Sequence, residues 1–272
     1  MNEEEFKKAV RKGFDEASAG YDKPAMRFFD NSAEHMVGGL ALKGDEHILD
    51  AATGTGKVAL AAARRLPKGR VTGFDLSDGM LNRAREKARE NDLNNILFHS
   101  ADVDGADFPP DYFDGLTCGF GVFFWTDMIT ALQKLIRFVK PGGFVAFTSF
   151  ADGSFKPQSD LCLDRFKQYG IKMPDTYSWQ RLDHPDKHRE LLTTVGLNQI
   201  DSHAAPMGYY LTDALQWWDL VTYTGFRGFL NQLSEEQVQR YKTEHLEEIA
   251  RTSDDQGIRL NVNVIFSIAR KK

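Results

Sequence analysis

The pattern of apolar and polar positions along the chain switches repeatedly between the periods of strands and helices. Short apolar runs predict β-strands at residues 47–52, 70–75, 95–99, 113–119, 144–150 and 198–204. Between most of these runs, apolar residues recur at helical spacing and predict helices, for example at residues 58–66, 78–92 and 126–139. Near the end of the chain, residues 260–269 alternate and predict a seventh strand. Strands that alternate with helices of this length favour an α/β fold, with a mostly parallel sheet and helices on both faces.

Two segments of the chain lack this alternation of strands and helices, so the chain divides into three parts. Residues 1–43 look helical and amphipathic, with Phe6, Val10 and Phe14 at about helical spacing. Residues 206–257 look mostly helical, are rich in aromatic residues and interrupt the α/β region before its last strand. We therefore expect an N-terminal helical segment at 1–43, one α/β domain made of 44–205 and 258–272, and a helical cap insertion at 206–257.

Composition and charge exclude several classes of protein. The chain has 34 basic and 39 acidic residues, a net charge of −5 and no long basic run, so we expect no nucleic-acid partner. Cys118 and Cys162 give neither a disulfide framework nor zinc spacing, so we expect no metal and a reducing compartment. The first residues lack the apolar core of a secretory signal, and no stretch approaches the roughly 18 apolar residues of a membrane span. These features predict a cytoplasmic protein.

A glycine-containing loop after the first strand carries the clearest chemical signal. Its sequence, Asp50-Ala51-Ala52-Thr53-Gly54-Thr55-Gly56, lets the backbone turn sharply, and the helix that follows offers free N–H groups to an anionic group. The same loop matches the dinucleotide pattern G-x-G-x-x-A, so by itself it leaves the ligand open. A phosphate-binding loop is excluded, because Val58 and Ala51 stand where that motif needs Ser or Thr and Gly.

Three carboxylates at strand ends narrow the choice of ligand. Asp75 ends the second strand and can accept hydrogen bonds from both ribose hydroxyls of a nucleoside, which suits NAD and S-adenosylmethionine equally. Asp102 follows the third strand, where an acid can accept from the exocyclic amine of adenine. Asp50 lies at the end of the first strand, which is unusual for a dinucleotide enzyme, and fits either a loop organiser or a partner for a cationic amino group.

Several motifs in a fixed order resemble one enzyme family. The matching blocks are His47–Gly56, Gly73–Leu81, Ser100–Val103, Phe113–Asp127 and Leu135–Phe147. Together they resemble class I S-adenosylmethionine-dependent methyltransferases, with the closest likeness to the ubiquinone/menaquinone C-methyltransferase branch and related small-molecule methyltransferases. The resemblance covers residues 45–150 and implies a Rossmann-like, seven-stranded, mostly parallel sheet with an antiparallel last strand. It also implies that residues 1–43 form a lid that folds over the cofactor.

The same resemblance implies a cofactor site for S-adenosyl-L-methionine. Its expected residues are Tyr21, Asp50, Ala52, Thr53, Gly54, Thr55, Gly56, Asp75, Leu76, Met80, Ala101, Asp102, Val103, Cys118, Gly119 and Phe120. The loop residues would hold the methionine part, Asp75 the ribose, and Asp102 the adenine. This chain departs from the family in two places: Ala52 replaces the first loop glycine, and residues 151–257 do not match the quinone enzymes.

The predicted function is in-line methyl transfer to a small, partly apolar or aromatic acceptor, at an O, C or N atom. Orientation supplies much of the rate of such a displacement. The seven histidines show no general-base pattern, so the catalytic residue stays unassigned. The expected substrate-binding residues are Phe123, Phe124, Tyr209 and Trp217. An NAD-dependent oxidoreductase and a non-catalytic S-adenosylmethionine-binding module are the alternatives, and the sequence leaves a homodimer or a monomer open.

Overall fold

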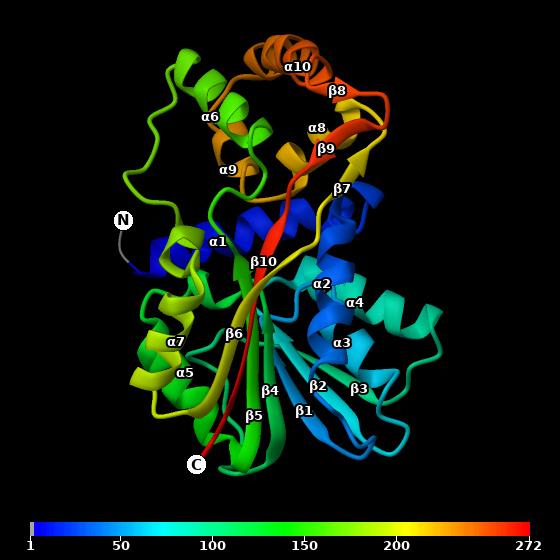
Figure 1. Ribbon diagram of the computed structural model, residues 1–272, viewed down its shortest axis with the longest axis vertical. Coiled ribbons are helices and arrows are strands. Elements are labelled where there is room, and N and C mark those ends of the chain that lie inside the picture. The colour runs from blue at the N-terminus through cyan, green and yellow to red at the C-terminus, as the bar shows by residue number, and fades with distance from the viewer. Residues whose placement is uncertain (1–2) are drawn as a thin grey trace.

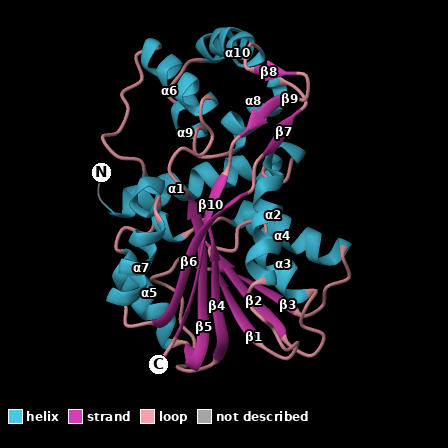
Figure 2. Cartoon of the chain, viewed as in Figure 1, coloured by secondary structure: helices cyan, strands magenta, loops and turns pink. Residues whose placement is uncertain are grey.

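Seven strands form the central sheet, in the order β3-β2-β1-β4-β5-β10-β6, in the computed structural model, which describes residues 3–272 (Figures 1 and 2). The strands are β1 (His47–Ala51), β2 (Arg70–Asp75), β3 (Ile96–Ser100), β4 (Phe113–Gly119), β5 (Val139–Phe150), β6 (Asn198–Pro206) and β10 (Asn263–Arg270). Neighbours among β1 to β5 pair in parallel, whereas β10 pairs antiparallel with both β5 and β6. The predicted α/β fold with an antiparallel last strand is therefore confirmed.

Helices cover the two faces of this sheet and fix the positions of its strand ends. They are α2 (Arg27–Gly38), α3 (Lys57–Ala63), α4 (Asp78–Glu90), α5 (Met128–Arg137) and α7 (Pro185–Thr194). Because both faces are covered, the central strand β1 is buried along most of its length, and Ile48 and Leu49 are fully buried. Side-chain caps begin three of these helices: Ser77 accepts from the N–H of Met80 at α4, Asp127 from that of Thr130 at α5, and His184 from that of Asp186 at α7.

The N-terminal helix α1 (Glu3–Ala17) crosses the carboxyl ends of the parallel strands (Figure 1). Two short 3₁₀ turns, η1 (Ser18–Gly20) and η2 (Pro24–Met26), lead from it to α2. Residues 1–2 of the predicted N-terminal segment lie outside the described residues. In the view of Figure 1, α1 separates the sheet from a smaller group of elements above it.

That upper group combines helices with a second, three-stranded sheet. Its elements are α6 (Gln158–Gln168), β7 (Tyr209–Leu211), α8 (Ala214–Tyr223), α9 (Arg227–Leu230), α10 (Glu235–Ala250), β8 (Ser253–Asp254) and β9 (Gly257–Leu260). The sequence pattern did not reveal this sheet, whose strand order is β7-β9-β8. The predicted strand at 260–269 is in fact divided between β9 and β10, because the chain passes from one sheet to the other around Val262. Within residues 3–272, no helix combines the length and apolarity needed to cross a bilayer.

Candidate active site

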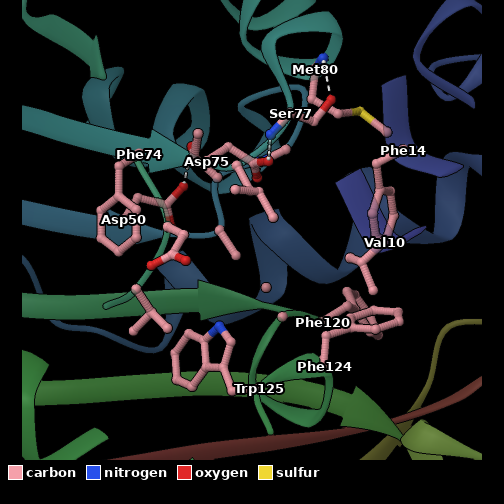
Figure 3. A pocket seen from close by; sticks show the side chains of 18 of the residues that line it. Val10, Phe14, Asp50, Phe74, Asp75, Ser77, Met80, Phe120, Phe124 and Trp125 are labelled. Atoms are coloured by element: carbon pink, nitrogen blue, oxygen red, sulfur yellow. Dashed lines mark hydrogen bonds between the residues drawn. The ribbon is translucent and has the colours of Figure 1, made fainter. Parts of the chain in front are cut away.

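A cavity of about 420 Å³ lies beneath α1, at the carboxyl ends of β1 to β4. This volume falls in the range of about 300–1,000 Å³ that is typical of small-molecule pockets, and strand ends of this kind are where open α/β sheets bind ligands. Acidic residues line one side and aromatic residues the other. In Figure 3, Asp50 and Asp75 face Phe120, Phe124 and Trp125 across the cavity.

The glycine-containing loop forms the floor of the cavity beside β1. Ala52 adopts a φ of +49° and Gly54 a φ of +55°, so the loop keeps the left-handed turn even where alanine replaces the family's glycine. A Cβ atom at Gly54 would meet nothing within 4 Å. Gly56 does not line the cavity: its α-carbon lies against α4, where an added Cβ would come within 3.0 Å of the Ala84 side chain. Gly56 thus packs against α4.

Asp75, at the end of β2, connects the two turns that border the cavity. One of its carboxylate oxygens accepts from the N–H of Gly54 and the other from the N–H of Ser77, each at 2.8 Å. Desolvation raises the pKa of Asp75, although these backbone donors oppose the shift. A carboxylate oxygen can accept more than one hydrogen bond, so both oxygens keep acceptor capacity for ligand hydroxyls.

Asp50 is the buried carboxylate of the site. It accepts from the hydroxyls of Thr117, at 2.7 Å, and of Thr53. Burial raises its pKa to about 6, and the two hydroxyl donors only partly offset that effect. A cationic partner would lower the pKa of this buried acid again, because the partner would favour its charged form.

Comparison with known proteins identifies the family. A family model described as a methyltransferase domain matches residues 48–143. Aklanonic acid methyltransferase DauC from Streptomyces sp. is 32% identical over 158 residues, which cover 57% of this chain and 72% of that protein. The chain belongs to the S-adenosylmethionine-dependent methyltransferases. Ubiquinone/menaquinone biosynthesis C-methyltransferase UbiE from Marinomonas sp. is 28% identical over 166 residues, covering 60% of this methyltransferase and 64% of that protein.

A solved structure supports the fold of the methyltransferase independently. Phosphoethanolamine N-methyltransferase 2 from Haemonchus contortus, in complex with S-adenosyl-L-methionine, superposes with a TM-score of 0.54 at 21% identity. The superposition covers 89% of this chain and 52% of that chain. At this level of identity the likeness establishes the fold and not the acceptor.

The residues around the cavity suit S-adenosylmethionine chemically. The ligand carries a positive sulfonium and an amino group, ribose hydroxyls and an adenine amine, all of which favour anionic or acceptor groups. The cavity presents three carboxylates, from Asp50, Asp75 and Asp102, together with the open α-carbon of Gly54. A nicotinamide dinucleotide carries two phosphates instead, and such a carboxylate-rich wall would repel them.

Asp102 is engaged by the N-terminal helix of the methyltransferase. Its carboxylate accepts from the N–H of Gly105 at 2.9 Å and lies 3.2 Å from the ammonium of Lys7. Burial raises the pKa of Asp102, but the donors from Gly105, Lys7 and Asp104 outweigh it and leave the pKa lowered. Asp102 is therefore ionised at neutral pH, and α1 is held directly above the expected adenine position.

Most of the predicted cofactor residues meet at this one cavity. Those that line it are Tyr21, Asp50, Ala52, Thr53, Gly54, Thr55, Asp75, Leu76, Met80, Ala101, Asp102, Val103, Gly119 and Phe120. Cys118 does not, because its side chain is buried beneath the loop, where an added Cβ at Gly121 would come within 2.6 Å of its sulfur. Burial also raises the pKa of the Cys118 thiol, so it remains protonated.

Of the four predicted substrate residues, only Phe124 lines the cavity. Phe123 points into the core and is 2% exposed. Trp217 is fully buried within the cap, where its indole N–H donates to His245 at 2.8 Å. Tyr209 donates its hydroxyl to the carbonyl oxygen of Ala25 at 2.6 Å. The structure thus places three of these aromatic residues in packing positions.

Two helix faces line the cavity without having been predicted to do so. Residues spaced three and four apart on α1 and α2 cover it, together with the turn after β4. The unpredicted lining residues include Phe6, Lys7, Val10, Arg11, Phe14, Phe29, Ser32, Ala33, Met36, Ser77, Trp125 and Thr148. Figure 3 shows Val10 and Phe14 closing one side of the cavity. The helical spacing of Phe6, Val10 and Phe14 was visible in the sequence, but it did not indicate which surface they would face.

Proposed function

We propose that this methyltransferase transfers a methyl group to a small, partly apolar or aromatic acceptor, at an O, C or N atom. The observation that carries the proposal is the aromatic wall opposite the carboxylates, formed by Phe14, Phe29, Phe120, Phe124 and Trp125. The rings of Phe29 and Phe120 meet edge to face at 5.1 Å, and those of Phe14 and Phe124 at 5.3 Å. Such a wall favours a flat apolar molecule over a highly charged one.

In this proposal, the acidic side of the cavity holds the cofactor. S-adenosylmethionine, when bound, supplies a methyl group on a positively charged sulfur. Asp75 accepts from the ribose hydroxyls, Asp102 from the adenine amine, and Asp50 pairs with the amino group directly or through water. Leu76, Met80, Ala101 and Val103 line the adenosine, and the loop from Ala52 to Thr55 with Gly119 and Tyr21 surrounds the methionine part.

The acceptor then lies against Phe120 and Phe124, with its nucleophilic atom turned toward the carboxyl end of β4. The role of the protein is to orient the acceptor and exclude water, which accounts for several kcal/mol of rate enhancement in well-aligned reactions, up to about 7–11 kcal/mol. Tyr21 is poorly suited as a base, because desolvation and the charges of Asp75 and Asp22 raise its pKa. An acceptor that ionises readily, such as a phenol, fits this site best.

The names of the relatives agree with this range of acceptors without selecting one. DauC is named for aklanonic acid and UbiE for ubiquinone and menaquinone biosynthesis. Residues 1–43 act as the lid in our proposal, and residues 206–257 as the cap.

Calorimetric titration with S-adenosylmethionine, S-adenosylhomocysteine and NAD tests the cofactor site first. We expect the first two to bind in the micromolar range and NAD not to bind. A transfer assay with labelled methyl donor then screens phenols, quinols and small amines. Phe124→Ala should lower kcat/KM for an acceptor while leaving the S-adenosylhomocysteine affinity unchanged, with the exposed Leu215→Ala as a matched control. Transfer only to large, highly charged acceptors would contradict the proposed acceptor class.

A further inference from the structure

The cap (residues 206–257) does not line the cavity. Of the described residues, those lining the cavity end at Thr148, so residues 206–257 contribute none. The cap instead packs against the chain that runs from α1 to α2, here called the entry segment (residues 14–29). Four separate contacts connect the two regions, although more than 180 residues separate them in sequence.

The first contact involves the end of α1, which binds the cap through one residue and the turn after β2 through the next. Glu16 accepts from the guanidinium of Arg227, at 3.0 Å, and from the amide of Asn231, at 3.1 Å, both in the cap. The adjacent residue, Asp15, accepts from the hydroxyl of Ser77 at 2.6 Å and from the N–H of Gly79 at 2.9 Å. Two neighbouring acids thus join the cap to the turn that follows Asp75.

The second contact surrounds Gly20, next to Tyr21. The ring of Tyr223 lies so close to Gly20 that an added Cβ would meet it at 2.5 Å. Lys23 binds the carboxylate of Asp219 at 2.6 Å, and its ammonium lies 4.9 Å from the centre of the Tyr223 ring. Both cap residues come from α8.

The remaining contacts fix the start of α2. Tyr209 donates to the carbonyl oxygen of Ala25, and Arg27 donates to that of Tyr210 at 2.7 Å. The guanidinium of Arg27 also lies 3.5 Å from the centre of the Tyr209 ring. Tyr209 therefore contacts the entry segment and does not line the cavity.

Residues that face the cavity alternate along the entry segment with residues that face the cap. Phe14, Tyr21 and Phe29 line the cavity, whereas Glu16, Lys23 and Arg27 bind the cap. We propose that Asp219, Tyr223 and Arg227 are positioning residues that hold the entry segment over the S-adenosylmethionine site. The inference rests on the proposed placement of the cofactor beside Tyr21. It gives the insertion, which lies beyond the methyltransferase family model, an indirect role in cofactor binding, through the entry segment.

Exchanging the charges of Lys23 and Asp219 tests whether this ion pair affects cofactor binding. Lys23→Asp should raise the Kd of S-adenosylhomocysteine about fivefold, since an exposed ion pair contributes up to about 1 kcal/mol. The double variant Lys23→Asp/Asp219→Lys should recover most of the affinity, because it restores opposite charges across the same gap. Calorimetry at low salt gives both values. An unchanged Kd in the single variant, or no recovery in the double variant, would overturn the inference.

Hydrogen exchange provides a second measurement that needs no ligand. Arg227→Met should increase amide exchange in residues 3–29 several-fold, while the strands of the central sheet keep their protection. Arg251→Met is the matched control, since Arg251 is an exposed cap residue whose ion pair lies within its own helix. Equal exchange in wild type and Arg227→Met would overturn the positioning role. Failure of the wild type to bind S-adenosylhomocysteine would instead overturn the cofactor placement, so the two failures are distinguishable.

Discussion

Arg181 holds the turn that carries the aromatic wall, although it lies outside the region that matches the family model. It belongs to η4 (Ser178–Leu182), and its guanidinium donates to three backbone carbonyl oxygens, those of Phe123 at 3.3 Å, Trp125 at 2.6 Å and Thr126 at 3.0 Å. Phe123 belongs to the 3₁₀ helix η3 (Val122–Phe124), and Trp125 and Thr126 follow it, where the last carbonyl groups of a helix have no intrahelical N–H donor. Removing the guanidinium leaves all three without their donor.

The expected loss in the free energy of unfolding follows from the strength of these hydrogen bonds. A hydrogen bond to a charged group contributes about 1.5–3 kcal/mol, but water can reach the half-exposed Arg181 and replace part of it. We therefore expect Arg181→Met to lower the free energy of unfolding by about 2 kcal/mol, mainly through the two shorter bonds. Arg181→Lys should recover less than half of this loss, because an ammonium cannot reproduce the planar fork of donors.

Urea unfolding with and without S-adenosylhomocysteine separates stability from binding. We expect the Kd for S-adenosylhomocysteine to rise as well, because the turn directly follows Gly119 and Phe120, which line the cavity at the expected cofactor position, and it becomes free to move. The exposed Lys172→Met is the control. If Arg181→Met matches the wild type in both unfolding and Kd, the turn does not depend on Arg181 and the reasoning is refuted.

Three further predictions address the carboxylates and the cap. Asp75→Asn replaces a carboxylate oxygen that would accept from the ribose hydroxyls with an amide N–H₂, which cannot accept. A hydrogen bond to a charged group contributes about 1.5–3 kcal/mol, so the Kd for S-adenosylhomocysteine should rise at least about tenfold in calorimetry; unchanged affinity would contradict the ribose placement. Burial raises the pKa of Asp50 from 3.8 to about 6, so the folded state retains a proton that the unfolded chain loses. The contribution of Asp50 to stability should therefore fall by about 2 kcal/mol as pH rises from 4 to 6, and Asp50→Asn should remove this part of the pH dependence in urea unfolding at several pH values. Trp217→Phe leaves the buried His245 nitrogen without its donor, so it should lower stability by about 1–3 kcal/mol yet leave cofactor affinity unchanged; a selective loss of affinity would instead place Trp217 in the site.

Local sequence patterns were sufficient to place the acidic side of the site. Asp50 and Asp75 each end a strand, and Gly54 turns the chain between strand and helix, so neighbouring residues alone determine these features. Parallel strands bring their carboxyl ends to one edge of a sheet, and this brought the three carboxylates together. The sequence also showed that Ala52 replaces the family's first loop glycine. Its φ of +49° shows that the loop tolerates a methyl group there.

The aromatic residues could not be assigned in the same way. Phe124 and Trp217 are both large and apolar, yet one lines the cavity and the other is fully buried in the cap. Burial against protein and burial against a ligand impose the same preference for apolar side chains, so the sequence does not distinguish them. The second sheet was missed for a related reason, because β8 has only two residues and gives no period to detect.

The sequence by itself therefore determined the α/β fold, the glycine-containing loop and the acids at the strand ends, since each depends on residues close together in the chain. Tertiary structure alone decided that α1 and α2 line the cavity, and that the cap binds residues 14–29. Contacts such as that between Glu16 and Arg227 join residues far apart in sequence. Their partners are chosen by the packing of whole helices, which no local pattern of hydrophobic and polar residues encodes.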